Sequence, residues 1–164
     1  MAGEFKLDVS AMVAKCEGRI NEVVQKIVIG ISAELMEKSP VGDPVLWKSP
    51  PPKGYIGGHF RANWQYAFNV PPGGIIDEID PSGDATKDEV ATRVSSTLGD
   101  GTHYLVNNLP YAQRLENGWS TQAPIGMVAL TVVDFSLIVN EAANGVQNGT
   151  SSEDFAAGFE TYKL

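Results

Sequence analysis

Few side chains in this sequence are of types that perform chemistry, and their spacing does not assemble a reactive site. The histidines His59 and His103 lie in different segments, and neither has a cysteine or second histidine at metal-ligand spacing. The single cysteine, Cys16, cannot form a disulfide within the chain. Because Cys16 falls on the apolar face of an expected helix, we expect it to fill part of the core.

The most concentrated charge lies between Asp77 and Glu89, where six acids face one basic residue, Lys87. Residues 77–84 lack the alternating ligands, the central glycine and the closing glutamate of an EF-hand, so we expect a solvated loop rather than a calcium site. The glycine pairs at 57–58 and 73–74 are not followed by the Gly-Lys-Ser/Thr of a phosphate loop. The sequence therefore predicts no enzyme activity, no metal and no cofactor.

Length and charge are those of an acidic globular protein with one domain. The chain has 164 residues, 43% of them hydrophobic, and a formal net charge of −8. The chain has 12 basic residues against 20 acids, which argues against a protein that binds DNA through its phosphates. It does not exclude a protein along which DNA passes without binding. No apolar run approaches the ~20 residues that span a bilayer, and the first six residues do not resemble a secretory signal.

Apolar residues at steps of three and four predict a long amphipathic helix over residues 8–38, ended by Ser39-Pro40. Residues 41–58 are rich in proline and glycine and predict a loop. Strict alternation of apolar and polar residues predicts a strand from Phe60 to Val70 that buries Trp64. A second strand is expected over residues 89–98, and a third over His103 to Val106.

The C-terminal third predicts two helices and a tail. Pro110 and Gly118 bracket a short helix, and Pro124 and Asn144-Gly145 bracket a longer one. We expect residues 1–145 to form one domain, and the polar residues 146–164 to form a mobile tail. The expected fold class is α+β. The N-terminal and C-terminal helices would pack on one face of a small antiparallel sheet, with long hairpin and Pro-rich loops around it.

Three phrases in a fixed order carry a family resemblance. They are Ser39-Pro40-Val41-Gly42-Asp43, then Gly57-Gly58-His59-Phe60-Arg61-Ala62-Asn63-Trp64, then Pro110-Tyr111-Ala112-Gln113-Arg114-Leu115-Glu116-Asn117-Gly118. In order and spacing the chain resembles, over roughly residues 8–144, the tail-component family of long-tailed bacteriophages. These small proteins complete the tail or join it to the head.

The resemblance implies a virion structural protein that forms a ring, commonly sixfold, at the head–tail junction. Its partners would be further copies of itself, the tail tube protein and a head-closure or connector protein. It would be assembled in the host cytoplasm, without membrane contact. Six copies would carry a formal charge of −48, six times −8, so DNA would pass through the ring without specific binding.

Two groups of residues are candidates for function in such a ring. Residues 44–56 form an insertion, because relatives have the glycine almost directly after the first phrase. The candidate subunit or partner contacts are Trp47, Tyr55, Arg61, Glu116 and Trp119. Arg61 and Glu116 are either ordinary surface charges or a pair that bridges the sheet to the short helix or to a neighbouring subunit.

The candidate channel-facing loop consists of Asp77, Glu78, Asp80 and Asp84. We expect it to be an extended, solvated hairpin connection that either lines the DNA channel or docks on a basic partner. Two alternative functions stay open. One is a neck or head-closure connector subunit. The other is of a different class: a small cytoplasmic binding module, or a hydrolase that uses the acid-rich loop.

Overall fold

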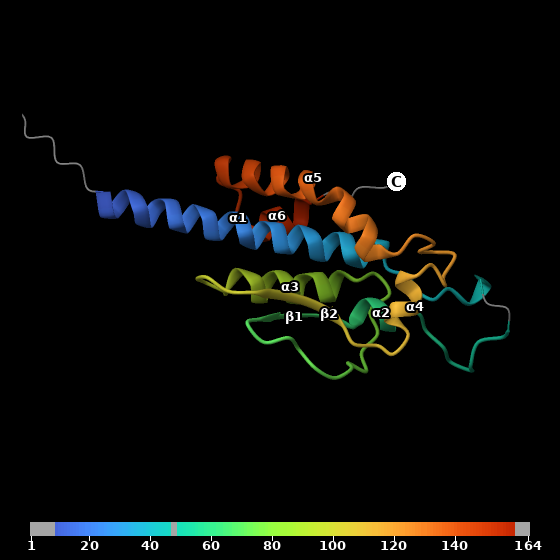
Figure 1. The fold of residues 1–164 in the computed structure, drawn as a ribbon. Coiled ribbons are helices and arrows are strands. Elements are labelled where there is room, and N and C mark those ends of the chain that lie inside the picture. The colour runs from blue at the N-terminus through green and yellow to red at the C-terminus, as the bar shows by residue number, and fades with distance from the viewer. Residues whose placement is uncertain (1–8, 47–48, 160–164) are drawn as a thin grey trace, which may run out of the picture.

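A computed structural model describes residues 9–46 and 49–159, and it has the expected α+β class. In chain order, the elements are α1 (Val9–Lys38), the 3₁₀ turn η1 (Pro44–Leu46), α2 (His59–Ala62), β1 (Trp64–Phe68), α3 (Asp84–Ser95), β2 (His103–Asn107), α4 (Ala112–Glu116), α5 (Met127–Gln147) and α6 (Ser152–Gly158). In Figure 1 the helices α1, α3, α5 and α6 all lie on one side of the two strands. The predicted arrangement, with helices covering one face of a small antiparallel sheet, is confirmed.

The sheet is smaller than expected, because β1 and β2 are its only strands in the described chain. They pair antiparallel, with Trp64 opposite Asn107 and Phe68 opposite His103. The expected strand over residues 89–98 is wrong: this segment belongs to helix α3. Its neighbouring residues Val90 and Ala91 are both buried, which fits a helix and not a strand, where successive side chains point to opposite faces.

The first strand begins later than the alternation of residues predicts. Phe60 lies on the single-turn helix α2 and is buried there, and the strand starts at Trp64. The side chain of Asn63 joins α2 to the loop after β1. Its Nδ2 donates to the carbonyls of His59 and Ile76, both at 2.8 Å, and its Oδ1 accepts from the backbone amide of Ile76 at 2.8 Å. These bonds end α2 and hold the loop that follows β1.

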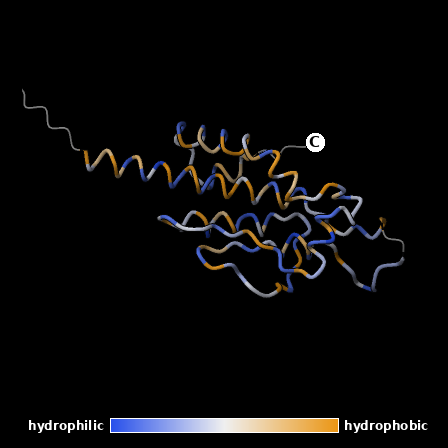
Figure 2. The backbone as a smooth tube through the Cα atoms, in the orientation of Figure 1, coloured by the Kyte–Doolittle hydropathy of each residue, from blue (hydrophilic) through white to orange (hydrophobic). Residues whose placement is uncertain are grey.

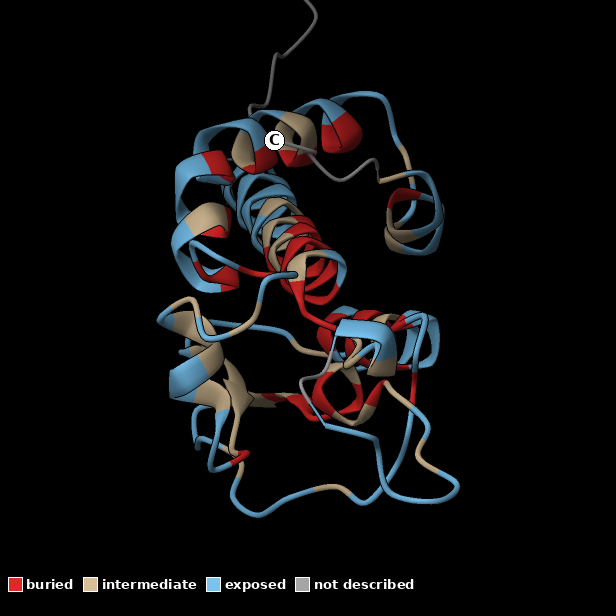
Figure 3. Cartoon of the chain, turned by 90° about the vertical axis from the view of Figure 1, so that its right-hand side faces the viewer, coloured by how far each residue is buried: buried red, intermediate tan, exposed pale blue. Residues whose placement is uncertain are grey.

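Helix α1 is the centre of the molecule over its C-terminal two thirds only. Here α5, α3 and α6 pack around it, and buried residues gather where α1 faces these neighbours (Figure 3). In Figure 2 the hydrophobic positions of α1 continue into the part that projects beyond the other helices. Cys16 lies in this projecting part and is exposed, so the expectation that it fills the core is wrong. No other described element reaches far enough to cover it.

The C-terminal tail is also different from its prediction. Residues 152–158 form α6, which packs against α1 and α3. The hydroxyl of Ser151 accepts from the amide of Asp154 at 3.0 Å and caps the helix, while Phe155 is buried over the side chain of Lys26. A capping serine and one aromatic anchor therefore order at least residues 152–159 of the expected mobile tail.

Helix α5 confirms the predicted C-terminal helix and corrects the expectation about membrane spans. By length and composition alone, α5 is the one helix of the described ranges that could cross a membrane. One face of α5 is nevertheless buried on α1, and there Asp134 accepts from the ammonium of Lys38 at 2.6 Å. Over the most apolar stretch of α5, 28% of the residues are buried, so the helix packs on α1 by one face and leaves apolar residues on the other.

Trp64 should contribute strongly to stability, because its ring is buried and its indole nitrogen donates to the hydroxyl of Ser39 at 2.9 Å. We expect Trp64→Ala to lower the free energy of unfolding by about 3–5 kcal/mol, measured by urea denaturation. Trp119→Ala is the matched control: this ring is 76% exposed, and its loss should cost less than about 0.5 kcal/mol. Equal costs for the two variants would contradict the burial of Trp64.

Candidate functional site

The end of α1 is held by the side chain of Arg61 from α2. Its guanidinium donates to the carbonyls of Glu37 (3.1 Å) and Ser39 (3.0 Å), at the end of α1. It also donates to the carbonyls of Pro81 (2.9 Å) and Ser82 (3.1 Å), just before α3. A cation is favourable at a helix C-terminus, where carbonyls lack intrahelical partners. Arg61 thus joins the first two phrases and orients the start of α3.

The glycine pair of the second phrase permits a close backbone crossing. The amide of Gly58 donates to the carbonyl of Val41 at 2.7 Å, and Gly58 has a positive φ of 108°. A Cβ at Gly58 would collide with the backbone of Asp80 and Pro81, and one at Gly57 would collide with the backbone of Val41. Glycine is required at this crossing, which places His59 and Phe60 beside residues 40–43.

The third phrase meets the second through its aromatic residue. The rings of Phe60 and Tyr111 lie 6.1 Å apart and tilted by 35°, and the hydroxyl of Tyr111 is 3.4 Å from Nδ1 of His59. At the other end of the phrase, the carboxylate of Glu116 accepts from the amides of Met127 (3.0 Å), Val128 (2.9 Å) and Ala129 (2.9 Å). Glu116 therefore caps α5 from the end of α4.

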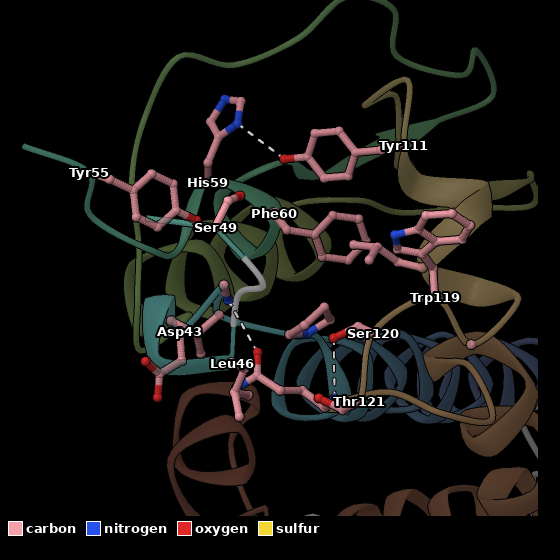
Figure 4. A pocket seen from close by; sticks show the side chains of 16 residues that line it. Asp43, Leu46, Ser49, Tyr55, His59, Phe60, Tyr111, Trp119, Ser120 and Thr121 are labelled. Carbon is pink, nitrogen blue, oxygen red and sulfur yellow. Dashed lines mark hydrogen bonds between the residues drawn. The ribbon is translucent and has the colours of Figure 1, made fainter. Parts of the chain in front are cut away.

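The three phrases surround one groove of about 890 Å³ (Figure 4). The first phrase contributes Pro40 to Asp43, the second His59 and Phe60, and the third Tyr111, Leu115 and Gly118. Tyr55 and Trp119 stand on different sides of the groove in Figure 4, and residues 120–122 close one end. Gly42 and Gln122 join the two walls, because the amide of Gly42 donates to the Gln122 side chain at 3.3 Å.

Most of the polar groups that line this groove form hydrogen bonds with other groups of the chain. Nε2 of His59 is bonded to the carbonyl of Ile76 at 2.9 Å, and the carboxylate of Asp43 accepts from the amide of Val45 at 2.9 Å. Burial raises the pKa of Tyr111, and the nearby Tyr55 raises it further. Burial also raises the pKa of the Tyr55 hydroxyl. Neutral hydroxyls and aromatic rings give a surface suited to packing, and we find no nucleophile activated by a base among these contacts.

The candidate contact residues divide into two groups. Tyr55 and Trp119 both line the groove, and Trp119 also stacks with the guanidinium of Arg114 at 5.8 Å. Arg61 and Glu116 do not pair with each other within the chain, so the interpretation as a bridge between the sheet and the short helix is wrong. Each binds backbone groups instead, so neither is an ordinary surface charge. Trp47 lies outside the described residues.

The acid-rich segment is not an extended hairpin connection, because it joins β1 to the helix α3. Asp77 and Glu78 are exposed, as expected for a solvated loop, and Asp84 is the first residue of α3. Asp80 is buried: its carboxylate accepts from the amides of Gly83 and Thr86, both at 2.9 Å. Asp80 thus caps α3 and cannot face a channel, which corrects the prediction for this residue.

Asp80 and Asp84 are both held in the charged form. Burial raises the pKa of the Asp80 carboxyl, but hydrogen bonds from Thr86, Gly83 and Ser82 outweigh this effect and bring the pKa below its ordinary value. The pKa of Asp84 is lowered mainly by its hydrogen bond with Lys87. Both shifts belong to the N-terminus of a helix and not to a catalytic pair of carboxyls.

Sequence reasoning missed the groove itself and its central pair, His59 and Tyr111. These residues are 52 positions apart, and no local pattern links them. Within the described chain, no three His, Cys, Asp or Glu side chains lie close enough to hold a metal ion. No protein-family model, no curated protein and no solved structure matches this chain.

The cap formed by Asp80 gives a prediction about acid stability. A carboxyl whose folded pKa is lowered stabilises the fold above its unfolded pKa of about 3.9, and this contribution is lost as the pH falls through the folded pKa. Asp80→Ala should therefore cost about 0.5–2 kcal/mol near neutral pH and progressively less below about pH 4, measured by urea denaturation. The exposed Asp77→Ala is the control and should change little. A cost for Asp80→Ala that is constant across this range would contradict the charged cap.

Proposed function

We propose that this chain is a structural subunit of the virion of a long-tailed bacteriophage. In this proposal it forms a ring, of six copies by the family resemblance, at the head–tail junction, where it terminates or completes the tail and joins it to the head. Its partners are its own copies, the tail tube protein and a head-closure or connector protein. A neck or connector position is the alternative within the same class.

The observation that carries the proposal is the convergence of the three phrases. They are widely separated in the sequence, yet they border one groove and are joined by Arg61, the glycine crossing at Gly58, and the contact between Phe60 and Tyr111. The residues that carry the family resemblance therefore build one local architecture. Its side chains hold the backbone in place and present aromatic rings, which suits an assembly protein better than an enzyme.

The charge of the chain supports passage of DNA without binding. Of the proposed channel residues, Asp77, Glu78 and Asp84 are exposed, and Asp88 and Glu89 continue the acidic surface along α3. Asp84 pairs with Lys87 at 2.7 Å, and Glu89 pairs with Arg93 at 3.4 Å, so Asp77 and Glu78 are the acids best placed to repel phosphates. In a ring with a large negative charge, repulsion would keep the genome from adhering to the wall.

Removal of the gene from a virus that carries it tests this function. Electron microscopy of the lysate should show particles that fail to mature in one of two ways. Overlong tails would assign a tail terminator, whereas tails of normal length that stay separate from filled heads would assign a neck or completion protein. Expression of the intact chain from a plasmid should restore complete virions in either case. Normal yields of complete, infectious virions without the gene would refute the proposal.

A further inference from the structure

The projecting N-terminal part of α1 carries a stripe of apolar side chains that no other element of residues 9–46 and 49–159 covers. We call Val9, Val13, Cys16 and Ile20 the α1 stripe; they follow the spacing i, i+4, i+7, i+11, so they lie on one side of the helix. Val9, Val13 and Ile20 are 59%, 49% and 62% exposed. With Met12 and Glu17 the stripe borders a shallow hollow of about 350 Å³.

Helix α5 carries a second stripe of the same kind on its solvent side. We call Val128, Val132, Phe135 and Val139 the α5 stripe, and it repeats the spacing i, i+4, i+7, i+11. Val128, Val132 and Phe135 are 43%, 67% and 47% exposed. Because each stripe extends over eleven steps along a helix, both are about 16 Å long. Two helices whose apolar residues share this heptad spacing can pack side by side with interlocking side chains.

Charge favours contact through these two surfaces. A chain of formal charge −8 repels its own copies, so association is cheapest where the local charge is small. From residue 9 to residue 22, α1 carries Lys15 and Arg19 against Glu17 and Glu22, a local net charge of zero. Between Met127 and Asn140, the only charged residue of α5 is Asp134, which is buried and paired with Lys38.

The two stripes are separated along the length of α1 (Figure 1). The α1 stripe is at the free N-terminal end of α1, whereas the α5 stripe begins at the N-terminus of α5, beside the C-terminal end of α1. They are too far apart to cover each other within one chain. A second copy can cover either stripe and still leave its own other stripe free, which is the geometry of head-to-tail association.

We propose that the α1 stripe of one copy packs on the α5 stripe of the next. The contact is heterologous, so its repetition yields a closed ring or an open filament. It does not require the phage assignment, although it would supply the subunit contact of the proposed ring. Phe135 is the largest side chain of the α5 stripe, and the hollow between Met12 and Ile20 offers it a place in the partner.

Two variants, each with one stripe blocked by a charge, test the proposal. Ile20→Glu blocks the α1 stripe and Val132→Glu blocks the α5 stripe with a charge of the same sign, so the two blocked stripes also repel each other. Ala14→Glu and Asn140→Glu place the same charge on exposed positions outside the stripes. Light scattering coupled to size exclusion should give a mass above one chain for the wild type and both controls at high concentration. Each blocked variant should associate at least about tenfold more weakly than the wild type.

A mixture of the two blocked variants gives the decisive result. Each retains one intact stripe, so together they should form a one-to-one pair that grows no further. Circular dichroism confirms that the variants are folded, and Val13→Glu with Phe135→Glu repeats the test if either fails to fold.

Four results would overturn the proposal. They are a wild type that stays monomeric at every concentration, control variants as weak as the blocked ones, and a mixture that does not pair. The fourth is a Val132→Glu variant that still dimerises, because its α1 stripe would then pack on another α1 stripe. A monomeric wild type that floats with phosphatidylcholine vesicles would instead assign α5 to a membrane surface. Head-to-tail association in solution, together with normal virions after gene removal, would support this contact and refute only the proposed function.

Discussion

The arrangement of the site depends on the hydrogen bonds that the guanidinium of Arg61 donates to backbone carbonyls. It binds four carbonyls that belong to the end of α1 and to the turn before α3, and α2 carries it into place. The indole of Trp64, on the same short segment, donates to the hydroxyl of Ser39. The side chains of Arg61 and Trp64 thus hold residues 37–39 in place. The groove begins directly after them, at Pro40.

The neighbouring helices pack closely on the C-terminal part of α1 and end near its middle, so its N-terminal part projects beyond them. A Cβ at Gly30 would press on Ile138 of α5 and Phe159, and one at Gly145 would press on Phe155 and Lys26, so small residues let the helices approach. The ammonium of Lys38 joins Glu34 of α1 to Asp134 of α5. Since α5 and α3 both end near the middle of α1, residues 9–20 extend beyond the core with an apolar side that no other described element covers.

Sequence periodicity predicted the parts of the fold that local pattern determines. The long helices, the buried Trp64 and the fold class follow from the spacing of apolar residues. Val90 and Val94 are spaced for one face of either a helix or a strand, and β-branched residues near a turn signal favoured the strand. The exposure of Cys16 could not be predicted, because an amphipathic stripe does not show where its partner ends. The roles of Asp80 and Glu116 as helix caps depend on backbone amides three or more residues away, which only the folded chain brings to them.

Amide hydrogen exchange on Arg61→Ala tests the central claim most directly. If the guanidinium joins the end of α1 to the start of α3, its loss should raise exchange together at residues 37–39 and 83–87, while the start of α5, capped by Glu116, keeps its protection. Arg93→Ala removes an exposed guanidinium of α3 and serves as the control. Faster exchange confined to α2, with the ends of α1 and α3 unchanged, would contradict the account.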